Sequence, residues 1–148
     1  MPARSLGSRR FLPLDRLFTK AGFGTVGTGT TLRGGLHVGD SVEAFGNAST
    51  LKDLKIRGLQ ALSNERSQVV AGMRTAVNLV GRRVDELKRG MVIASAGVFQ
   101  ATPSCVALLD VLEQAEKLAE ETLTAHIGTT EREVRVIPLG RQIIGPGK

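Results

Sequence analysis

Two adjacent charged residues break the pattern of an otherwise apolar strand near the start of the chain. Asp15 and Arg16 lie in the run FLPLDRLFT, from Phe11 to Thr19, whose alternation predicts a half-buried strand. The apolar face of that strand consists of Leu12, Leu14 and Phe18. Arg16 interrupts this face. Neighbouring side chains on a regular strand point to opposite faces, so Asp15 and Arg16 are not expected to pair with each other.

A second arginine has a similar setting later in the chain. Arg74 follows the turn residue Gly72 and lies in a predicted strand from Met73 to Val80, on the same face as Ala76. A guanidinium in this position can bind an anion through charge-assisted hydrogen bonds, or it can extend its polar end into solvent. The spacing alone leaves both interpretations open.

A glycine-rich segment formally matches a dinucleotide-binding pattern. Residues Gly22 to Gly27 fit GxGxxG, in which the glycines let a pyrophosphate approach the start of a helix. The threonine-rich run from Gly24 to Leu32 favours a strand instead of that helix. The phosphate-loop pattern GxxxxGKS/T is absent, since Gly145 is followed by Pro146. We therefore predict a turn and a strand that bind no dinucleotide, and no nucleotide hydrolysis by this chain.

Three further side chains could in principle act as ligands or nucleophiles. His37 and His126 lack neighbouring ligand residues at the spacing of a metal site, and Cys105 has no base beside it. We interpret His37 as part of a turn or edge strand, His126 as part of a strand, and Cys105 as a small packing residue. No catalytic residue, metal site or cofactor is expected, and the chain is predicted not to be an enzyme.

The composition indicates a folded and basic chain. Apolar residues make up 41% and charged residues 23%, and 18 glycines without Trp or Tyr suggest short strands joined by tight turns. The formal charge of +6 favours an anionic partner, above all nucleic acid, although a solvated basic surface without a partner would carry the same charge. One cysteine, no membrane-length apolar run and no signal region favour a cytoplasmic protein without a membrane partner.

Short strands must position these residues. Turn signals separate strands expected near 36–38, 41–45, 51–59 and 73–80, followed by a helical turn at 84–89 and a strand at 91–94. This spacing is typical of a β-barrel or sandwich. We interpret residues 1–8 as a tail or linker, 9–98 as this β domain and 99–148 as a second unit.

The fold of the second unit stays open at this level. Apolar residues from Leu108 to Leu123 recur at helical spacing, which predicts an amphipathic helix. The apolar run from Cys105 to Leu112 and the run from Glu133 to Leu139 fit equally well to strands joined by a polar loop. Nothing local decides between helix and strands for residues 105–125.

Five segments of the first domain, in order, resemble domain II of the translational GTPases. They are LDRLFT from Leu14, GFGTVGTGT from Gly22, GLHVGD from Gly35, AGMRTAVNL from Ala71 and LKRGMV from Leu87. The Asp-Arg pair with the Phe-Thr that follows, and the arginine after Gly-Met, are most similar to the selenocysteine-specific elongation factor. Gly27 departs from the family, which usually has a β-branched residue there.

The resemblance implies an all-β fold, a Greek-key β-barrel of the elongation-factor domain II type followed by an incomplete second β-barrel. It also implies that the chain holds selenocysteyl-tRNA for delivery to the ribosome, with Asp15, Arg16 and Arg74 around the selenocysteyl group. A guanidinium suits an ionised selenol chemically. The alternatives are a general elongation factor or initiation-factor subunit that shares the barrel, and a structural barrel without an RNA ligand.

The segment from Ser104 to Leu139 resembles the start of domain III, which favours strands over the helix. The similarity includes HIGT from His126, a strand and turn in the family. The family's domain III continues beyond Pro146, and its GTPase domain and winged-helix modules have no counterpart here. The chain is therefore expected to be a fragment whose partner is the GTPase domain of the same parent chain, where GTP and Mg would bind.

Overall fold

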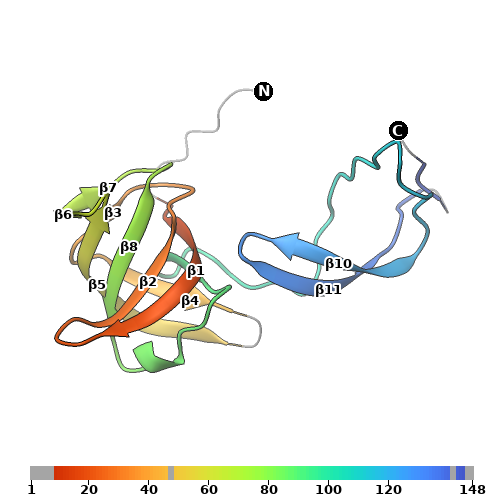
Figure 1. Ribbon diagram of the computed structural model, residues 1–148. Coiled ribbons are helices and arrows are strands. Elements are labelled where there is room, and N and C mark those ends of the chain that lie inside the picture. Colours follow the sequence, from red (N-terminus) through yellow and green to blue (C-terminus); the bar gives the residue numbers. More distant parts are fainter. Residues whose placement is uncertain (1–8, 47–48, 141–142, 146–148) are drawn as a thin grey trace. The chain divides into compact units, whose positions relative to one another are not determined.

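The structure, a computed structural model, describes residues 9–46, 49–140 and 143–145. Its regular secondary structure consists of strands and one short 3-10 turn (Figure 1). The chain divides into two compact units, one of Met1–Ala101 with Gly128–Thr130, the other of Thr102–Ile127 with Glu131–Lys148. In the described part of the chain, no helix is long and apolar enough to cross a membrane.

The first unit contains the strands expected from the sequence. Its elements are β1 (Phe11–Lys20), β2 (Gly24–Thr30), β3 (Leu36–His37), β4 (Ser41–Phe45), β5 (Thr50–Ala61), β6 (Asn64–Arg66), β7 (Gln68–Val69), β8 (Arg74–Val80), the 3-10 turn η1 (Val84–Glu86) and β9 (Val92–Ser95). The short strands β6 and β7 were not predicted. The turn before β6 is made by Leu62 and Ser63 with positive φ angles of 52° and 64°, and therefore carries no glycine signal.

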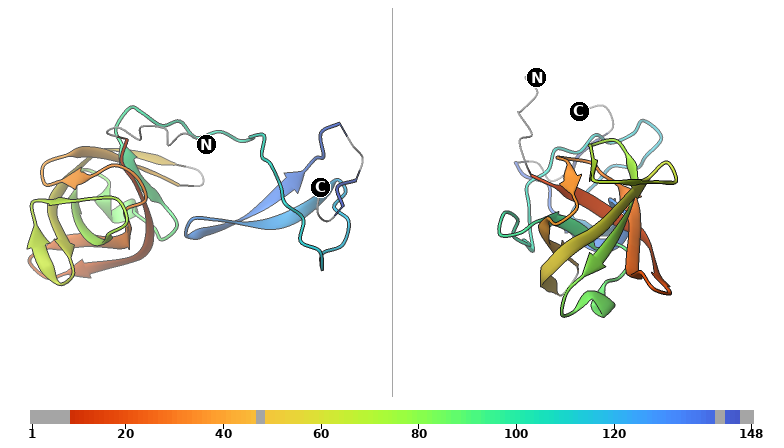
Figure 2. Two further views of the ribbon diagram at one scale, coloured as in Figure 1. Left: turned by 90° about the horizontal axis from the view of Figure 1, so that it is seen from above. Right: turned by 90° about the vertical axis from the view of Figure 1, so that its left-hand side faces the viewer.

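Six of these strands close into a barrel. Their order is β4-β9-β1-β2-β8-β5, and β5 pairs again with β4. All neighbours are antiparallel. In Figure 2 these strands, coloured red to green, curve around a common interior. Closure leaves no unpaired edge within the six-stranded ring, and the predicted all-β barrel is confirmed.

Alternate residues of the barrel strands fill a single apolar core. Large side chains with at most 1% of their surface exposed include Leu12, Leu14, Leu36, Leu51, Leu54, Ile56, Leu79 and Ile93. Burying one side chain of this size contributes roughly 1.5–3 kcal/mol. Phe99 packs against Phe11 and Phe45, with ring centroids 5.8 and 6.4 Å apart. This packed core holds the strands rigidly, and the strands in turn fix the positions of the side chains on the outer face of the barrel.

A β-bulge interrupts the first strand at Asp15. Leu14 pairs with Gly29 of β2, but the next paired residue, Arg16, lies opposite Thr28, so Asp15 is the extra residue. Leu14 is buried, and Leu17 packs against the same core although three positions separate the two. The residues between these leucines are consequently displaced to the outer side of the barrel.

The bulge overturns two expectations about this strand. Asp15 and Arg16 do not face opposite sides, because the extra residue breaks the alternation between them. The predicted apolar face is also wrong, since Leu17 takes the inward position and Phe18 is 47% exposed. Arg16 does not interrupt an inward face. Strand periodicity assumes a regular ladder and gives no sign of where a residue is inserted.

The GxGxxG segment is a hairpin, as predicted. Gly22 and Gly24 have φ angles of 78° and 83°, which non-glycine residues adopt rarely, and they turn β1 into β2. The residues that would begin a helix in a dinucleotide site instead continue as β2.

In the described part of the second unit, β10 (Glu121–Ile127) and β11 (Thr130–Val136) form a hairpin (Figure 1). Leu118 forms an isolated bridge with Ile144. Residues 105–120 form neither the helix nor the first strand that the sequence allowed. Several of their apolar side chains are open to solvent, and Val106 and Leu108 are 83% and 96% exposed. Cys105 is exposed as well, and its interpretation as a packing residue is wrong.

Candidate functional site

The outer face of β1 and β8 brings together two of the three residues singled out from the sequence. Asp15 and Arg74 are 59 positions apart in the chain and form a bidentate ion pair. The Arg74 Nη2 donates to Asp15 Oδ1 at 2.9 Å, and its Nη1 donates to Oδ2. Two parallel hydrogen bonds fix the plane of the guanidinium as well as its position.

The strand between them supplies a third member. Thr28 of β2 donates its hydroxyl to Asp15 Oδ1 at 2.9 Å, and Arg74 Nη2 lies 3.4 Å from the same hydroxyl oxygen. Thr28 was not singled out in the sequence. Its position beside Asp15 depends on the bulge, which is invisible in the alternation of residue types.

The ion pair shifts the ionisation of both partners. The Arg74 hydrogen bond holds the pKa of Asp15 below its ordinary value of 3.8, although partial burial acts in the opposite direction. The hydrogen bond from Asp15 raises the pKa of Arg74. The Asp15 and Arg74 side chains are 26% and 53% exposed, so solvent screens the pair and its contribution to stability is about 1 kcal/mol or less. At neutral pH the pair carries no net charge.

Arg16 supplies the uncompensated charge next to this pair. It is exposed and lies opposite Thr28 in the register of β1 and β2. Its positive charge also lowers the pKa of Asp15, the smallest of the effects on that carboxylate. Arg16 forms no ion pair with any residue the structure describes. The three predicted site residues therefore lie on one outer face, where a neutral ion pair stands beside a cation that no described residue pairs.

The basic charge of the chain belongs to the barrel. Residues 9–101 carry 14 Lys and Arg against 7 Asp and Glu, a formal charge of +7. Residues 102–148 carry 5 basic and 7 acidic side chains, a formal charge of −2. An anionic partner would consequently be attracted to the unit that holds Asp15, Arg16 and Arg74.

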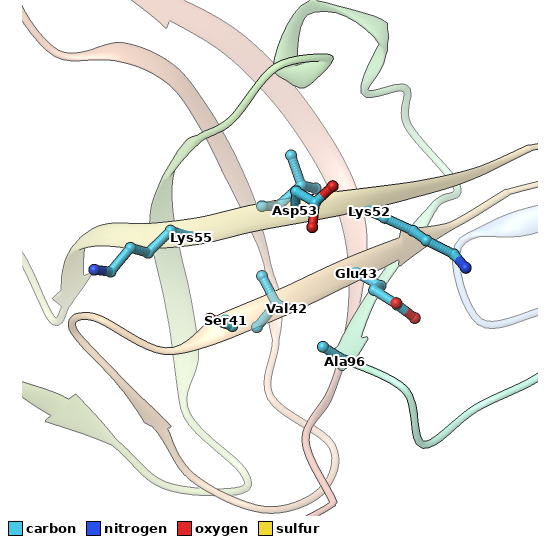
Figure 3. Close-up of a pocket in the computed structure, with 8 residues that line it drawn as sticks. Ser41, Val42, Glu43, Lys52, Asp53, Lys55 and Ala96 are labelled. Atoms are coloured by element: carbon cyan, nitrogen blue, oxygen red, sulfur yellow. The ribbon is translucent and has the colours of Figure 1, made fainter.

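A shallow groove between β4 and β5 is a weaker candidate (Figure 3). It has a volume of about 320 Å³, and its charged lining residues are Glu43, Lys52, Asp53 and Lys55. Figure 3 shows Lys52 and Lys55 extending in opposite directions along the strand. Because the two cations do not converge on a common point, the groove is not built to hold an anion.

The two histidines occupy strands. His37 lies in the short strand β3, and its Nδ1 is 3.6 Å from Asp40 Oδ2. Asp40 also accepts hydrogen bonds from the backbone N–H of His37 and from Arg10, so this cluster ties a turn to the barrel. His126 lies in β10, as predicted. Within the described ranges, no three His, Cys, Asp or Glu side chains are grouped as a metal site would need.

Comparison with known proteins agrees with this architecture. Residues 24–94 match the family described as elongation factor Tu domain 2, a segment that runs from β2 into β9 and includes Arg74. The chain is also 34% identical, over 139 residues or 93% of its length, to the selenocysteine-specific elongation factor of Desulfomicrobium baculatum. It spans 22% of the length of that relative. The closed six-stranded barrel and these two matches show that the chain contains a domain II of the translational GTPase type.

Proposed function

We propose that this chain binds the aminoacylated end of selenocysteyl-tRNA, as the barrel region of a selenocysteine-specific elongation factor that delivers this tRNA to the ribosome. The observation that carries the proposal is the Asp15–Arg74 pair with Arg16 beside it on the outer face of a basic domain II barrel. GTP and Mg would bind to a GTPase domain elsewhere in the parent chain, and the whole factor would act in the cytoplasm. This barrel would itself catalyse no reaction.

The charges of the site suit a selenocysteyl group. A selenol is ionised near neutral pH, and Arg16 offers it a positive charge that no described side chain neutralises. Arg74 uses one N–H of each terminal nitrogen for Asp15 and a second N–H of Nη2 for Thr28, which leaves Nε–H and one N–H of Nη1 without a partner among the described residues. From the described residues Asp15 Oδ2 accepts one hydrogen bond, so it retains a lone pair for the α-amino group of an esterified amino acid.

The first test is equilibrium binding of labelled selenocysteyl-tRNA to the chain over a series of salt concentrations. We expect binding that weakens linearly on a logarithmic scale as salt increases, because phosphate contacts release counterions. Absence of binding at low salt, or a high affinity that does not change with salt concentration, would argue against the proposal.

The second test is selectivity. Replacing Arg74 by Met should reduce the preference for selenocysteyl-tRNA over seryl-tRNA by on the order of 1.5–3 kcal/mol, the range for hydrogen bonds to charged groups. Arg66→Met is the matched control, since Arg66 is exposed on β6 at the edge of the sheet. That control should weaken the binding of both tRNAs by the same factor. If Arg74→Met also leaves the ratio of the two affinities unchanged, Arg74 serves only as the ion-pair partner of Asp15 and the pocket assignment is wrong.

A further inference from the structure

We propose that Thr28 is a positioning residue, whose hydroxyl holds Asp15 against Arg74 and thereby sets how strongly the site prefers one aminoacyl group over another. The selectivity part of this proposal rests on the proposed function. The positioning part rests on the hydrogen bonds of the free protein alone.

Thr28 has a central place in the network. It lies on β2, opposite Arg16 of β1 on one side and Ala76 of β8 on the other. Its hydroxyl is 2.9 Å from Asp15 Oδ1 and 3.4 Å from Arg74 Nη2. It therefore touches both members of the ion pair, which come from the two strands that flank its own.

Asp15 needs such support because of the bulge. As the extra residue of β1, it has no partner opposite it in the ladder with β2. Among the described residues, its carboxylate is hydrogen-bonded by Arg74 and Thr28. Arg74 is long and about half exposed, whereas Thr28 is half-buried and β-branched, with few allowed side-chain conformations. Thr28 is thus the more rigid of the two supports.

The hydroxyl also decides which oxygen of the carboxylate faces a ligand. Oδ1 accepts hydrogen bonds from Thr28 and Arg74, whereas Oδ2 accepts from Arg74. Without the hydroxyl, the carboxylate can turn and take the guanidinium with it. The free acceptor on Asp15 and the free donors on Arg74 would then no longer have a fixed arrangement toward a bound aminoacyl group.

Three variants separate the hydroxyl from the shape of the side chain. Thr28→Val removes the hydroxyl and keeps the β-branch, and Thr28→Ser keeps the hydroxyl. Thr30→Val is the matched control, because Thr30 lies on the same strand and face, is also half-buried, and has no side-chain hydrogen bond within the described part of the chain.

In binding of selenocysteyl-tRNA and seryl-tRNA at one low salt concentration, we expect Thr28→Val to lower the ratio of the two affinities about tenfold, or ~1.4 kcal/mol. In Thr28→Ser, the ratio of the two affinities should stay within about twofold of its value in the parent chain, which corresponds to ~0.4 kcal/mol. Thr30→Val should leave the ratio unchanged. A ratio that Thr28→Val does not alter would refute the selectivity role.

A measurement on the free chain decides the positioning role without tRNA. The pKa of Asp15, followed by NMR of its carboxyl carbon, should rise in Thr28→Val and stay unchanged in Thr28→Ser, because the hydroxyl stabilises the ionised carboxylate. An unchanged pKa in Thr28→Val would refute positioning. If the parent chain binds neither tRNA, the proposed function and the selectivity role fail together, while this titration still decides whether Thr28 holds Asp15.

Discussion

Replacing Gly29 by alanine should disrupt the bulge that presents Asp15. Gly29 lies on β2 opposite Leu14, the last residue before the bulge. A Cβ atom at this position would lie 2.0 Å from the backbone oxygen of Pro13 and 3.1 Å from Leu12 Cδ1. The nearer contact is to backbone, so it cannot be relieved by rotating a side chain. Relief requires β1 and β2 to separate by about 1 Å, which loosens interdigitated packing of the core.

Gly27, two residues away on the same inner face, provides the comparison. A Cβ atom there would lie 2.8 Å from Leu14 Cδ2 and 3.5 Å from Leu17 Cδ2, and both leucine side chains can rotate. Overpacking costs about 1–3 kcal/mol, and we place Gly29→Ala at the upper end. For Gly27→Ala the cost is offset by the roughly 0.5–1 kcal/mol that alanine gains over glycine in a strand. The net change at Gly27 should be under about 1 kcal/mol.

Thermal unfolding measures the difference. A loss of 1 kcal/mol lowers the Tm of a domain of this size by roughly 4–8 °C, so Gly29→Ala should lower it by about 12–24 °C and Gly27→Ala by only a few degrees. The chain contains no Trp or Tyr, so the transition should be followed by far-ultraviolet circular dichroism, with amide exchange at Leu14 reporting on the bulge. Equal Tm values for the two variants would refute the reasoning.

Two further predictions concern charge and association. Asp15→Asn should lower the Tm by a few degrees above about pH 5 and by progressively less below pH 3.8. The reason is that a carboxylate with a depressed pKa stabilises the fold only while it is ionised. A difference in Tm that does not depend on pH would contradict this prediction. The chain should self-associate through its second unit, where Leu108 and Ile127 are 96% and 60% exposed. Sedimentation should show Ile127→Lys weakening that association, and a monomeric parent at all concentrations would exclude it.

The strands of the barrel could be predicted from the sequence because the residues that form its turns are recognisable locally. Gly22, Gly24, Gly39, Gly72 and Gly90 all have positive φ and stand at or next to turns, so the strands between them could be placed from residue types alone. The second unit lacked that information. Its apolar residues fitted two periodicities, and several of them are exposed in the structure, which no local pattern records.

The site was predictable only in part, for a geometric reason. Asp15, Arg16 and Arg74 came from the resemblance to a family, and the structure places them on one face. Strand alternation by itself placed Asp15 and Arg16 on opposite faces, and it gave no reason to select Thr28. Both failures have the same cause, since a single inserted residue changes which side chains meet across strands without changing the composition of either strand.

The closure of the ring constrains how the barrel can form during synthesis. β1 pairs with β9, so Phe11 meets Ala94 across a loop of the chain that contains nearly the whole domain. At 5–20 residues per second a ribosome needs roughly 4–17 s to proceed from one to the other. Until β9 emerges, one flank of β1 stays unpaired and available to other nascent chains. Nascent chains that stall before residue 92 should therefore remain open sheets that require a chaperone. In chains that extend beyond β9, the barrel can close at the rate set by non-local strand pairing.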